Sequence, residues 1–280
     1  MSSRYNLLKP MEPPADFRVL AIMPVYNEID IMAAVLKHIE MSGLLIYVID
    51  NGSTDGTWEL VKSWKGNAMV GYERFPYREG KENTCYDLAL ISARVGEIAG
   101  TSDANWAVWH DADEYMEPPV SGLALRQAIY GVDTCGYNAI EFRLITFVPI
   151  DNSFVPGTDY VAHFNYWTES YGVKACKWIR AWRVPQSHVD FPAGSHEIDF
   201  PGRQVFPGKF ILRHYPLRSQ SHAERKIFKE RIPRYSETGK AKGWHVQYSG
   251  TKEGDCFLGD PQTLRKLTDN FLEEVNQLDG

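Results

Sequence analysis

The sequence predicts an α/β fold in which a mostly parallel, Rossmann-like sheet is flanked by helices, and three observations predict it. Residues 17–24, 44–49 and 107–110 are nearly continuous apolar runs, as expected of strands buried on both faces. Helix-like apolar spacing separates these runs. Each run is followed directly by a cluster of polar residues. A strand, a helix and a strand in this length predict a right-handed parallel crossover.

The first half of the chain justifies this prediction element by element. Pro24 ends the hydrogen bonding of the first strand, and the next helix stops at Gly43, a position typical of a C-terminal cap. The remaining elements are a second strand, a helix, a short strand, a long helix and a fourth strand, over residues 44–49, 57–64, 69–72, 83–98 and 107–110. This alternation is typical of a doubly wound sheet.

The second half has a different pattern, which predicts a mixed or antiparallel sheet and C-terminal helices. Strand-like alternation with many aromatic residues is found at residues 139–148, 173–184 and 205–214, and a long loop spans residues 151–168. We expect helices over residues 120–130 and 223–232, the latter with a capping box of Ser221 and Glu224. A last amphipathic helix should open at residues 260–261, with one apolar face made of Leu264, Leu267, Phe271, Val275 and Leu278.

Composition excludes several classes of protein. The 280 residues are 44% hydrophobic and 24% charged, which argues against disorder beyond the ends, and a net charge of −6 argues against a nucleic-acid polymer as partner. No apolar run approaches the roughly 20 residues that cross a bilayer, and the N-terminus lacks a signal-peptide pattern. We expect a soluble cytoplasmic protein, with contact at the inner face of a membrane left open. The four widely spaced cysteines predict buried thiols at positions 85, 135, 176 and 256.

The acidic turn after residues 107–110 is the strongest local signal. Asp111 and Asp113 stand two residues apart, so in extended backbone both side chains point the same way, while Ala112 keeps the turn uncrowded. Carboxylate oxygens suit Mg²⁺ or Mn²⁺, which usually complete their shells with substrate phosphates. The alternative is an acidic surface turn, and the position after a buried strand favours the metal.

Three motifs then carry a family resemblance. The segments 24–28 (PVYNE), 48–57 (VIDNGSTDGT) and 111–114 (DADE), in this order, closely resemble the family-two glycosyltransferases of GT-A fold. The resemblance covers roughly residues 17–216. It implies a single GT-A domain over 16–216. Residues 1–15, with Pro10, Pro13 and Pro14, are expected to form an arm, and residues 217–280 a helical extension. Within the domain the resemblance implies a nucleotide-binding half over 16–115 and an acceptor-binding half over 116–216.

The resemblance also implies which residues bind the donor and the metal. Those matching the nucleotide-binding positions are Pro24, Tyr26, Glu28, Asp50, Asn51, Ser53, Asp55, Asp111 and Ala112. Asp113 matches the chief metal ligand, with Asp111 touching ribose or metal-bound water. For Tyr26 and Glu28, packing and helix capping are the alternatives. For the loop after Asp50 it is a turn favoured by backbone geometry alone.

A later segment, 211–216 (ILRHYP), is similar to a stretch of the family in which a histidine approaches the metal or the diphosphate. His214 is therefore a candidate ligand, and imidazole favours Mn²⁺ over Mg²⁺. A structural histidine is the alternative. A basic block could hold the diphosphate or form a solvated helix face, and consists of Arg213, Arg218, Arg225, Lys226 and Arg231.

The implied mechanism is inverting transfer, in which a carboxylate deprotonates an acceptor hydroxyl and the metal stabilises the departing nucleoside diphosphate. The base must lie opposite the diphosphate, so it should come from the second half of the domain. The candidates are Asp190, Glu197 and Asp199, of which Glu197 is preferred. The aromatic residues of 154–182 offer stacking surfaces for a carbohydrate acceptor, or ordinary core.

These expectations define one function and two rivals. The favoured function is metal-dependent transfer of one sugar from a nucleotide-diphosphate donor, expected to be UDP-linked, to a carbohydrate, lipid-linked or other hydroxyl acceptor. Polymer synthesis is disfavoured because the chain lacks a Gln-x-x-Arg-Trp segment and membrane-spanning runs. The rivals are a nucleotidyltransferase, which would carry a glycine-rich basic loop after the first strand, and a non-catalytic relic that binds carbohydrate or nucleotide.

Overall fold

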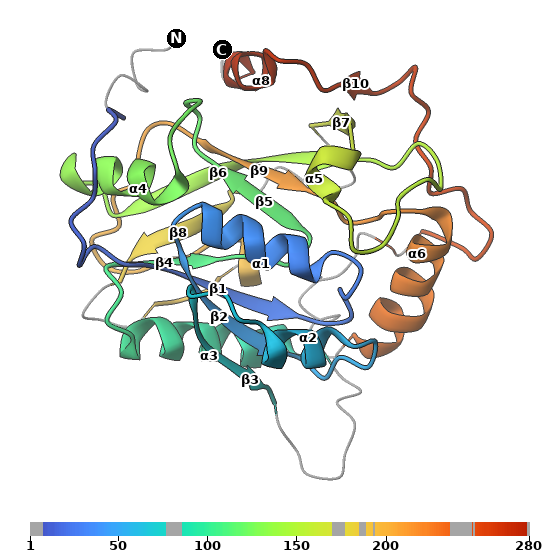
Figure 1. The fold of residues 1–280 in the computed structure, drawn as a ribbon, viewed down its shortest axis with the longest axis horizontal. Coiled ribbons are helices and arrows are strands. Elements are labelled where there is room, and N and C mark those ends of the chain that lie inside the picture. Colours follow the sequence, from blue (N-terminus) through green and yellow to red (C-terminus); the bar gives the residue numbers. More distant parts are fainter. Residues whose placement is uncertain are drawn as a thin grey trace.

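The computed structural model describes residues 8–76, 86–169, 177–184, 189–192, 194–235, 248 and 250–278 (Figure 1). Its strands form one mixed sheet with the order β10-β7-β6-β8-β4-β1-β2-β3, to which β9 and β5 are added beside β6. The strands that carry the motifs are β1 (Val19–Val25), β2 (Leu45–Asp50) and β4 (Trp106–Trp109). The edge strand next to β2 is β3 (Met69–Arg74).

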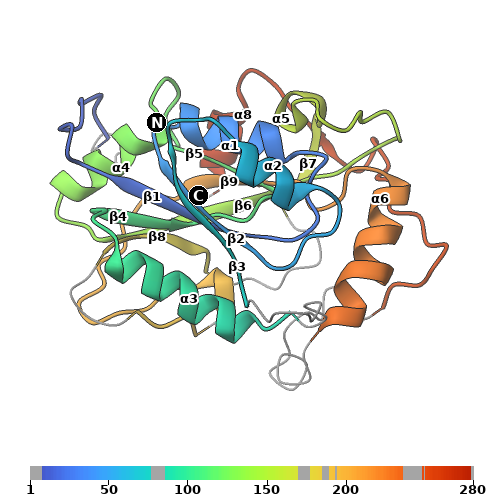
Figure 2. The ribbon, with the colours of Figure 1, turned by 60° about the horizontal axis from the view of Figure 1, so that its bottom comes forward.

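The first four strands are parallel, as predicted. β1 pairs with β2 and β4, and β2 pairs with β3, all in parallel register. Helices α1 (Met32–Met41) and α2 (Thr57–Ser63) pack on one face of this sheet, and α3 (Leu88–Thr101) packs on the other (Figure 2). The two faces of β1 therefore contribute to two separate clusters of buried apolar side chains.

The second half is mixed, also as predicted. β8 (Ile179–Arg183) runs antiparallel to β4 and to β6 (Ala139–Phe147). β9 (Phe210–His214) runs parallel to β6 and antiparallel to β5 (Glu114–Glu117). Strand β5 follows the acidic turn at once, so the turn lies between two strands that belong to different parts of the sheet. The α/β architecture with a mixed sheet is consistent with a GT-A fold.

The predicted helix bounds shift in three places, and the helix expected over residues 83–98 is α3 (Leu88–Thr101). The helix expected over residues 120–130 is α4 (Leu125–Thr134). The helix expected over residues 223–232 is a continuous segment of three parts, namely α6 (Gln220–Glu224), the π-helical η3 (Arg225–Arg231) and the short η4 (Ile232–Arg234). Its cap is Ser219 rather than Ser221, because Oγ of Ser219 accepts a 3.1 Å hydrogen bond from the backbone N–H of His222.

The last predicted helix is largely wrong. The chain instead forms a two-residue strand, β10 (Arg265–Lys266), and a helix, α8, that begins only at Phe271 and ends at Gln277. β10 pairs antiparallel with β7 (Tyr166–Thr168), and the backbone N–H of Leu267 donates to the carbonyl of Asn165 at 2.7 Å. Pairing with a distant strand thus overrides the local helical spacing, while Phe271 and Val275 still enter the core.

Two further expectations concern cysteines and membrane segments. Cys135 and Cys256 are exposed, so the prediction of buried thiols is wrong for these two, while Cys85 and Cys176 lie outside the described residues. Within the described ranges, no helix has the length and apolar character needed to span a membrane.

Candidate functional site

The three sequence motifs meet at one edge of the sheet, beyond the carboxyl ends of β1, β2 and β4. Val25 lies opposite Asp50, and the backbone N–H of His110 donates to the carbonyl of Ile22 at 3.1 Å, so the strand ends are level. The segment of α6, η3 and η4 lies across this same edge (Figure 2). A site at this edge therefore combines the three motifs with the segment over residues 220–234. Ligands of open α/β sheets bind at this edge.

Hydrogen bonds of Asn27, from its backbone and its side chain, connect the first two motifs. Asn27 has a left-handed φ of 53°, a conformation that asparagine tolerates better than most residues. Its backbone N–H donates to Oγ of Ser53 at 3.0 Å, and its Oδ1 accepts from the backbone N–H of Thr54 at 2.8 Å. Asp55 accepts the backbone N–H groups of Ile29 and Thr57 at 3.0 Å each. Ser53 and Asp55 thus order the loop, and their contact with a donor stays a prediction.

Asp50 is fully buried at the end of β2, and only one of its oxygens is satisfied. Oδ1 accepts the backbone N–H groups of Gly52 and Ser53 at 3.1 Å each, and Nε of Arg74 lies 3.1 Å away. Oδ2 has no hydrogen-bond partner among the described residues. Burial raises the pKa of Asp50 despite these donors. A buried carboxylate oxygen without a donor is costly, so this atom is suited to accept an N–H from a ligand.

Asn51 and Tyr26 are joined by an arginine from the far end of the chain. Nη2 of Arg234 donates to the backbone oxygen of Asn51 at 2.9 Å and to its Oδ1 at 2.7 Å. The guanidinium carbon lies 3.5 Å from the centre of the Tyr26 ring. One face of Tyr26 is therefore covered, so a stacked base could use only the other. Pro24 lies opposite Ile49 in the β1–β2 ladder.

Asp111 is held by two donors, one to each oxygen. Nε1 of Trp109 donates to Oδ1 at 2.9 Å, and Nη2 of Arg180 donates to Oδ2 at 2.8 Å. Arg180 also bonds the buried Glu114. Burial alone would raise the pKa of Asp111, but the charge of Arg180 outweighs it and lowers that pKa. For Glu114 burial dominates and raises the pKa well above its usual value. Ala112 is buried between the two aspartates.

Asp113 faces three basic side chains. Nζ of Lys226 donates to its Oδ2 at 2.8 Å, and Nε2 of His214 lies 3.7 Å from the same oxygen. Burial would raise the pKa of Asp113, but Lys226, His214 and the charge of Arg231 hold it well below its usual value. Asp113 is therefore ionised. His214 does lie next to the aspartate with which the sequence paired it.

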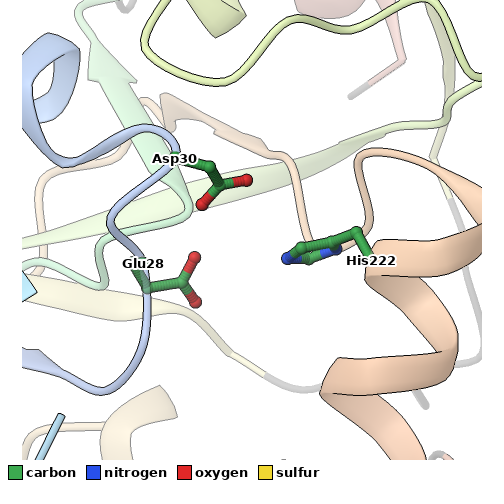
Figure 3. A group of neighbouring side chains, drawn as sticks. All are labelled: Glu28, Asp30 and His222. Atoms are coloured by element: carbon green, nitrogen blue, oxygen red, sulfur yellow. The ribbon is translucent and has the colours of Figure 1, made fainter. Parts of the chain in front are cut away.

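A second acidic group lies beside this one. Glu28 and Asp30, from the loop after β1, face His222 on α6, and their ligand atoms lie within 4.8 Å of one another (Figure 3). This is a possible metal-binding group, but the guanidinium of Arg218 contacts all three side chains. Its Nε donates to Asp30 at 2.6 Å, and its Nη2 donates to His222 Nε2 at 2.7 Å and also to Glu28. The arginine thus occupies the space that an ion would need.

The acidic side chains in this arrangement do not fit a divalent cation. Such an ion needs several oxygen atoms that face one empty position. Both oxygens of Asp111 are taken by protein donors, Oδ2 of Asp113 and Oε1 of Glu28 are taken by Lys226, and Asp30 is taken by Arg218. Metal ligation by Asp111, Asp113 and His214 stays a prediction, and it would require these contacts to change.

Arg213 does not join the other residues of the site. Alternation along β9 turns it away from the face of His214, and its Nε donates to Glu117 at 2.5 Å. Its guanidinium lies 4.4 Å from the centre of the Phe271 ring. The contacts of Arg213 thus connect β9 to α8, and the structure does not bring it to Asp113.

The three candidate bases lie near the short η2 helix (Gly194–His196). Asp190 and Asp199 are exposed and pair through their backbones at 2.8 and 2.9 Å. Glu197 is a quarter exposed, and one oxygen lies 3.3 Å from Nη1 of Arg203. The neighbouring His196 packs on Trp178 with ring centres 4.2 Å apart.

A chain of contacts runs from this helix to the acidic turn. The guanidinium of Arg180 lies 5.4 Å from the Trp178 ring, and Arg180 bonds Asp111. Trp178 is half-buried, so it remains a candidate stacking surface. Three other aromatic residues of the stretch are fully buried and belong to the core, namely Tyr160, Trp167 and Trp182. Of the three bases, Glu197 is the one adjacent to this chain of contacts.

Sequence reasoning missed two arginines of the site. Arg180 is the second residue of β8 and is fully buried, and its position between the apolar residues Ile179 and Ala181 was the available signal. Arg234 follows the basic block, which ends at Arg231, and its closeness to that block in the sequence was the available signal. Arg218 and Lys226 belong to that block, but nothing in their spacing indicated which carboxylates they would meet.

Comparisons with known proteins agree with the geometry of the first half. Residues 20–128 match the model of a family described as Glycosyl transferase family 2. The matched range contains all three motifs but neither Glu197 nor the basic segment of α6 and η3. A search of curated proteins finds no relative of this chain.

Proposed function

Because residues 20–128 match the model of Glycosyl transferase family 2, a family of enzymes that transfer a sugar from a nucleotide sugar, we propose that this protein moves one sugar from a UDP-linked donor to a hydroxyl acceptor. The anomeric centre is inverted in the transfer. The donor lies across the carboxyl ends of β1, β2 and β4, with its base at Asp50 and its diphosphate at the basic side chains around Asp113.

The unpaired oxygen of Asp50 is the observation that carries the choice of donor. Oδ2 is buried and has no donor among the residues of the described ranges. The uracil ring offers an imide N–H between two carbonyls, so it can donate to this oxygen. A charge-assisted hydrogen bond of this kind contributes about 1.5–3 kcal/mol. Tyr26 supports the same base with the ring face that Arg234 leaves open.

Glu197 acts as the base in this proposal. It removes the proton of the acceptor hydroxyl, whose oxygen attacks the anomeric carbon as the bond to the diphosphate breaks. The electron pair of that bond goes to the diphosphate oxygen, and the proton goes to Glu197. Support comes from the contacts that link its neighbour His196, through Trp178 and Arg180, to Asp111.

The proposal is tested with a panel of nucleotides and nucleotide sugars. We expect UDP to raise the melting temperature more than GDP or ADP, and a UDP-sugar to be hydrolysed slowly without an acceptor. Asp50→Asn should abolish the preference for UDP, while Asp103→Asn, at an exposed aspartate, should retain it. Stabilisation by UDP without turnover on any sugar or acceptor would instead support a binding relic. No response to any nucleotide would contradict the proposal.

A further inference from the structure

Lys226 occupies the position at which the sequence predicted a metal ion. Its Nζ lies 2.8 Å from Oε1 of Glu28 and 2.8 Å from Oδ2 of Asp113, and so bridges the first and third motifs. We infer that Lys226 is a built-in cation that binds the diphosphate of the donor, and that a divalent metal competes with it for Asp113. This inference rests on the proposed function.

The ammonium is held in a way that leaves it able to bind a ligand. Lys226 is only 3% exposed, and a buried ammonium is tolerated only when it is paired. It has three N–H donors, and the structure provides two acceptors among the described residues. The third donor has no acceptor among the described residues, and in this proposal a phosphate oxygen of the bound nucleotide accepts it. Lys226 lies on the π-helical η3, and such turns are frequent at functional sites.

The surroundings of Asp113 are already positive. Arg231, on the same η3 segment, is half-buried, and its guanidinium has no hydrogen-bond partner in the part of the chain that the structure describes. Arg218 fills the space on the other side of Glu28. A divalent cation at Asp113 would therefore lie close to the positive charges of these basic side chains. Repulsion between like charges a few ångströms apart is large at low dielectric.

The ammonium of Lys226 can stabilise the negative charge that develops on the departing diphosphate without transferring a proton to it. As the bond between the anomeric carbon and the diphosphate oxygen breaks, that oxygen gains the electron pair. Lys226 donates a hydrogen bond to the diphosphate and keeps its proton, so the charge is stabilised by a group that is already in position. Arg231 lies on the same segment and can add a second donor. A lysine suits this role because its ammonium is a compact point charge.

The test compares UDP binding by calorimetry in EDTA and in Mn²⁺. We expect the wild-type protein to bind UDP in EDTA, with an affinity that Mn²⁺ changes by less than about threefold. Lys226→Met should lose about 10- to 100-fold in EDTA, the loss expected for one charge-assisted hydrogen bond, and Mn²⁺ should restore part of it. Lys229→Met is the matched control, because Lys229 lies on η3 but is exposed, and its binding should equal that of the wild type.

A second measurement uses Mn²⁺ alone and does not depend on any nucleotide. Electron paramagnetic resonance should detect tighter Mn²⁺ binding to Lys226→Met than to the wild type or to Lys229→Met, and adding Asp113→Asn should remove the gain. Equal Mn²⁺ binding by all variants would overturn the inference.

The outcomes separate the inference from the proposed function. If UDP binds the wild type only with Mn²⁺, the proposed function stands and the inference fails. If no nucleotide binds under either condition, both fail. Should Lys226→Met not fold, the wild-type comparison in EDTA and Mn²⁺ decides the question.

Discussion

The guanidinium of Arg234 lies over the ring of Tyr26, 3.5 Å from its centre, and donates two hydrogen bonds to Asn51. Tyr26 and Asn51 follow neighbouring strands near the start of the chain, whereas Arg234 ends the basic segment some two hundred residues later. One side chain thus ties the last part of the site to the first two motifs. The first two motifs are therefore held in place in part by the segment that follows β9.

Replacing Arg234 should destabilise the protein and loosen its nucleotide site together. Arg234→Ala removes both hydrogen bonds and the contact with the Tyr26 ring, so we expect the free energy of unfolding to fall by about 1.5–3 kcal/mol. Urea denaturation measures this loss, and UDP affinity should fall about tenfold. Lys229→Ala, at an exposed position of the same segment, should change the free energy of unfolding by less than about 0.5 kcal/mol. Equal losses for the two variants would contradict this role.

Asp50→Asn should leave the unliganded protein as stable as the wild type or make it more stable at neutral pH. Burial raises the pKa of Asp50, so folding favours the protonated form. The stability contributed by Asp50 is complete below its ordinary pKa of 3.8 and is lost as the pH rises through the raised folded value. The advantage of the variant should therefore appear as the pH rises above about 4. Melting temperatures of both proteins across pH 3–7 check this, and an advantage that grows toward acid would refute it.

Glu197→Gln should separate binding from turnover. The amide keeps the shape of the side chain but cannot accept the acceptor proton, so we expect transfer to slow by about 10²- to 10⁴-fold. UDP affinity should stay within about twofold of the wild type, because in this proposal Glu197 contacts the acceptor and not the nucleotide. A tenfold loss of affinity would correspond to about 1.4 kcal/mol. Asp199→Asn is the matched control, because Asp199 is exposed and also lies near Arg203. Full activity in Glu197→Gln would show that the base lies elsewhere.

Arg180→Met should be among the most destabilising single changes in the domain. Arg180 is fully buried and donates to both Asp111 and Glu114, so its loss leaves the buried Glu114 and the partly exposed Asp111 without their cation. Removing one partner of such a group costs about 3–5 kcal/mol. Arg183→Met on the same strand is the control, since its side chain is 61% exposed and the cost should stay below about 1 kcal/mol. Thermal and chemical unfolding measure both, and similar costs would mean that the buried pairing contributes little.

Local patterns were sufficient for the parallel half of the fold. A continuous apolar run and the polar cluster after it can be recognised from residues that are adjacent in the sequence. A strand that is buried on both faces consists almost entirely of apolar residues, so its burial can be predicted from those residues alone. For this reason β1, β2 and β4, each followed by a polar motif, were predicted correctly. The same approach failed for residues 260–270, where β10 pairs with β7 although the apolar spacing is helical. Pairing between distant segments overrides a weak local preference.

The types of residue in the site could thus be identified from the sequence, whereas the contacts between them required the folded structure. The linear order of residues was enough to identify an α/β sheet, its acidic turn and the similarity of residues 20–128 to Glycosyl transferase family 2. The partners of the carboxylates came from the folded chain, because Arg180, Arg218 and Lys226 reach them across 66 to 198 positions of sequence. Contacts over such separations have no local signature. The contacts of Lys226 exist because η3 crosses the strand ends, and a buried charge is tolerated only when it is paired with an opposite one.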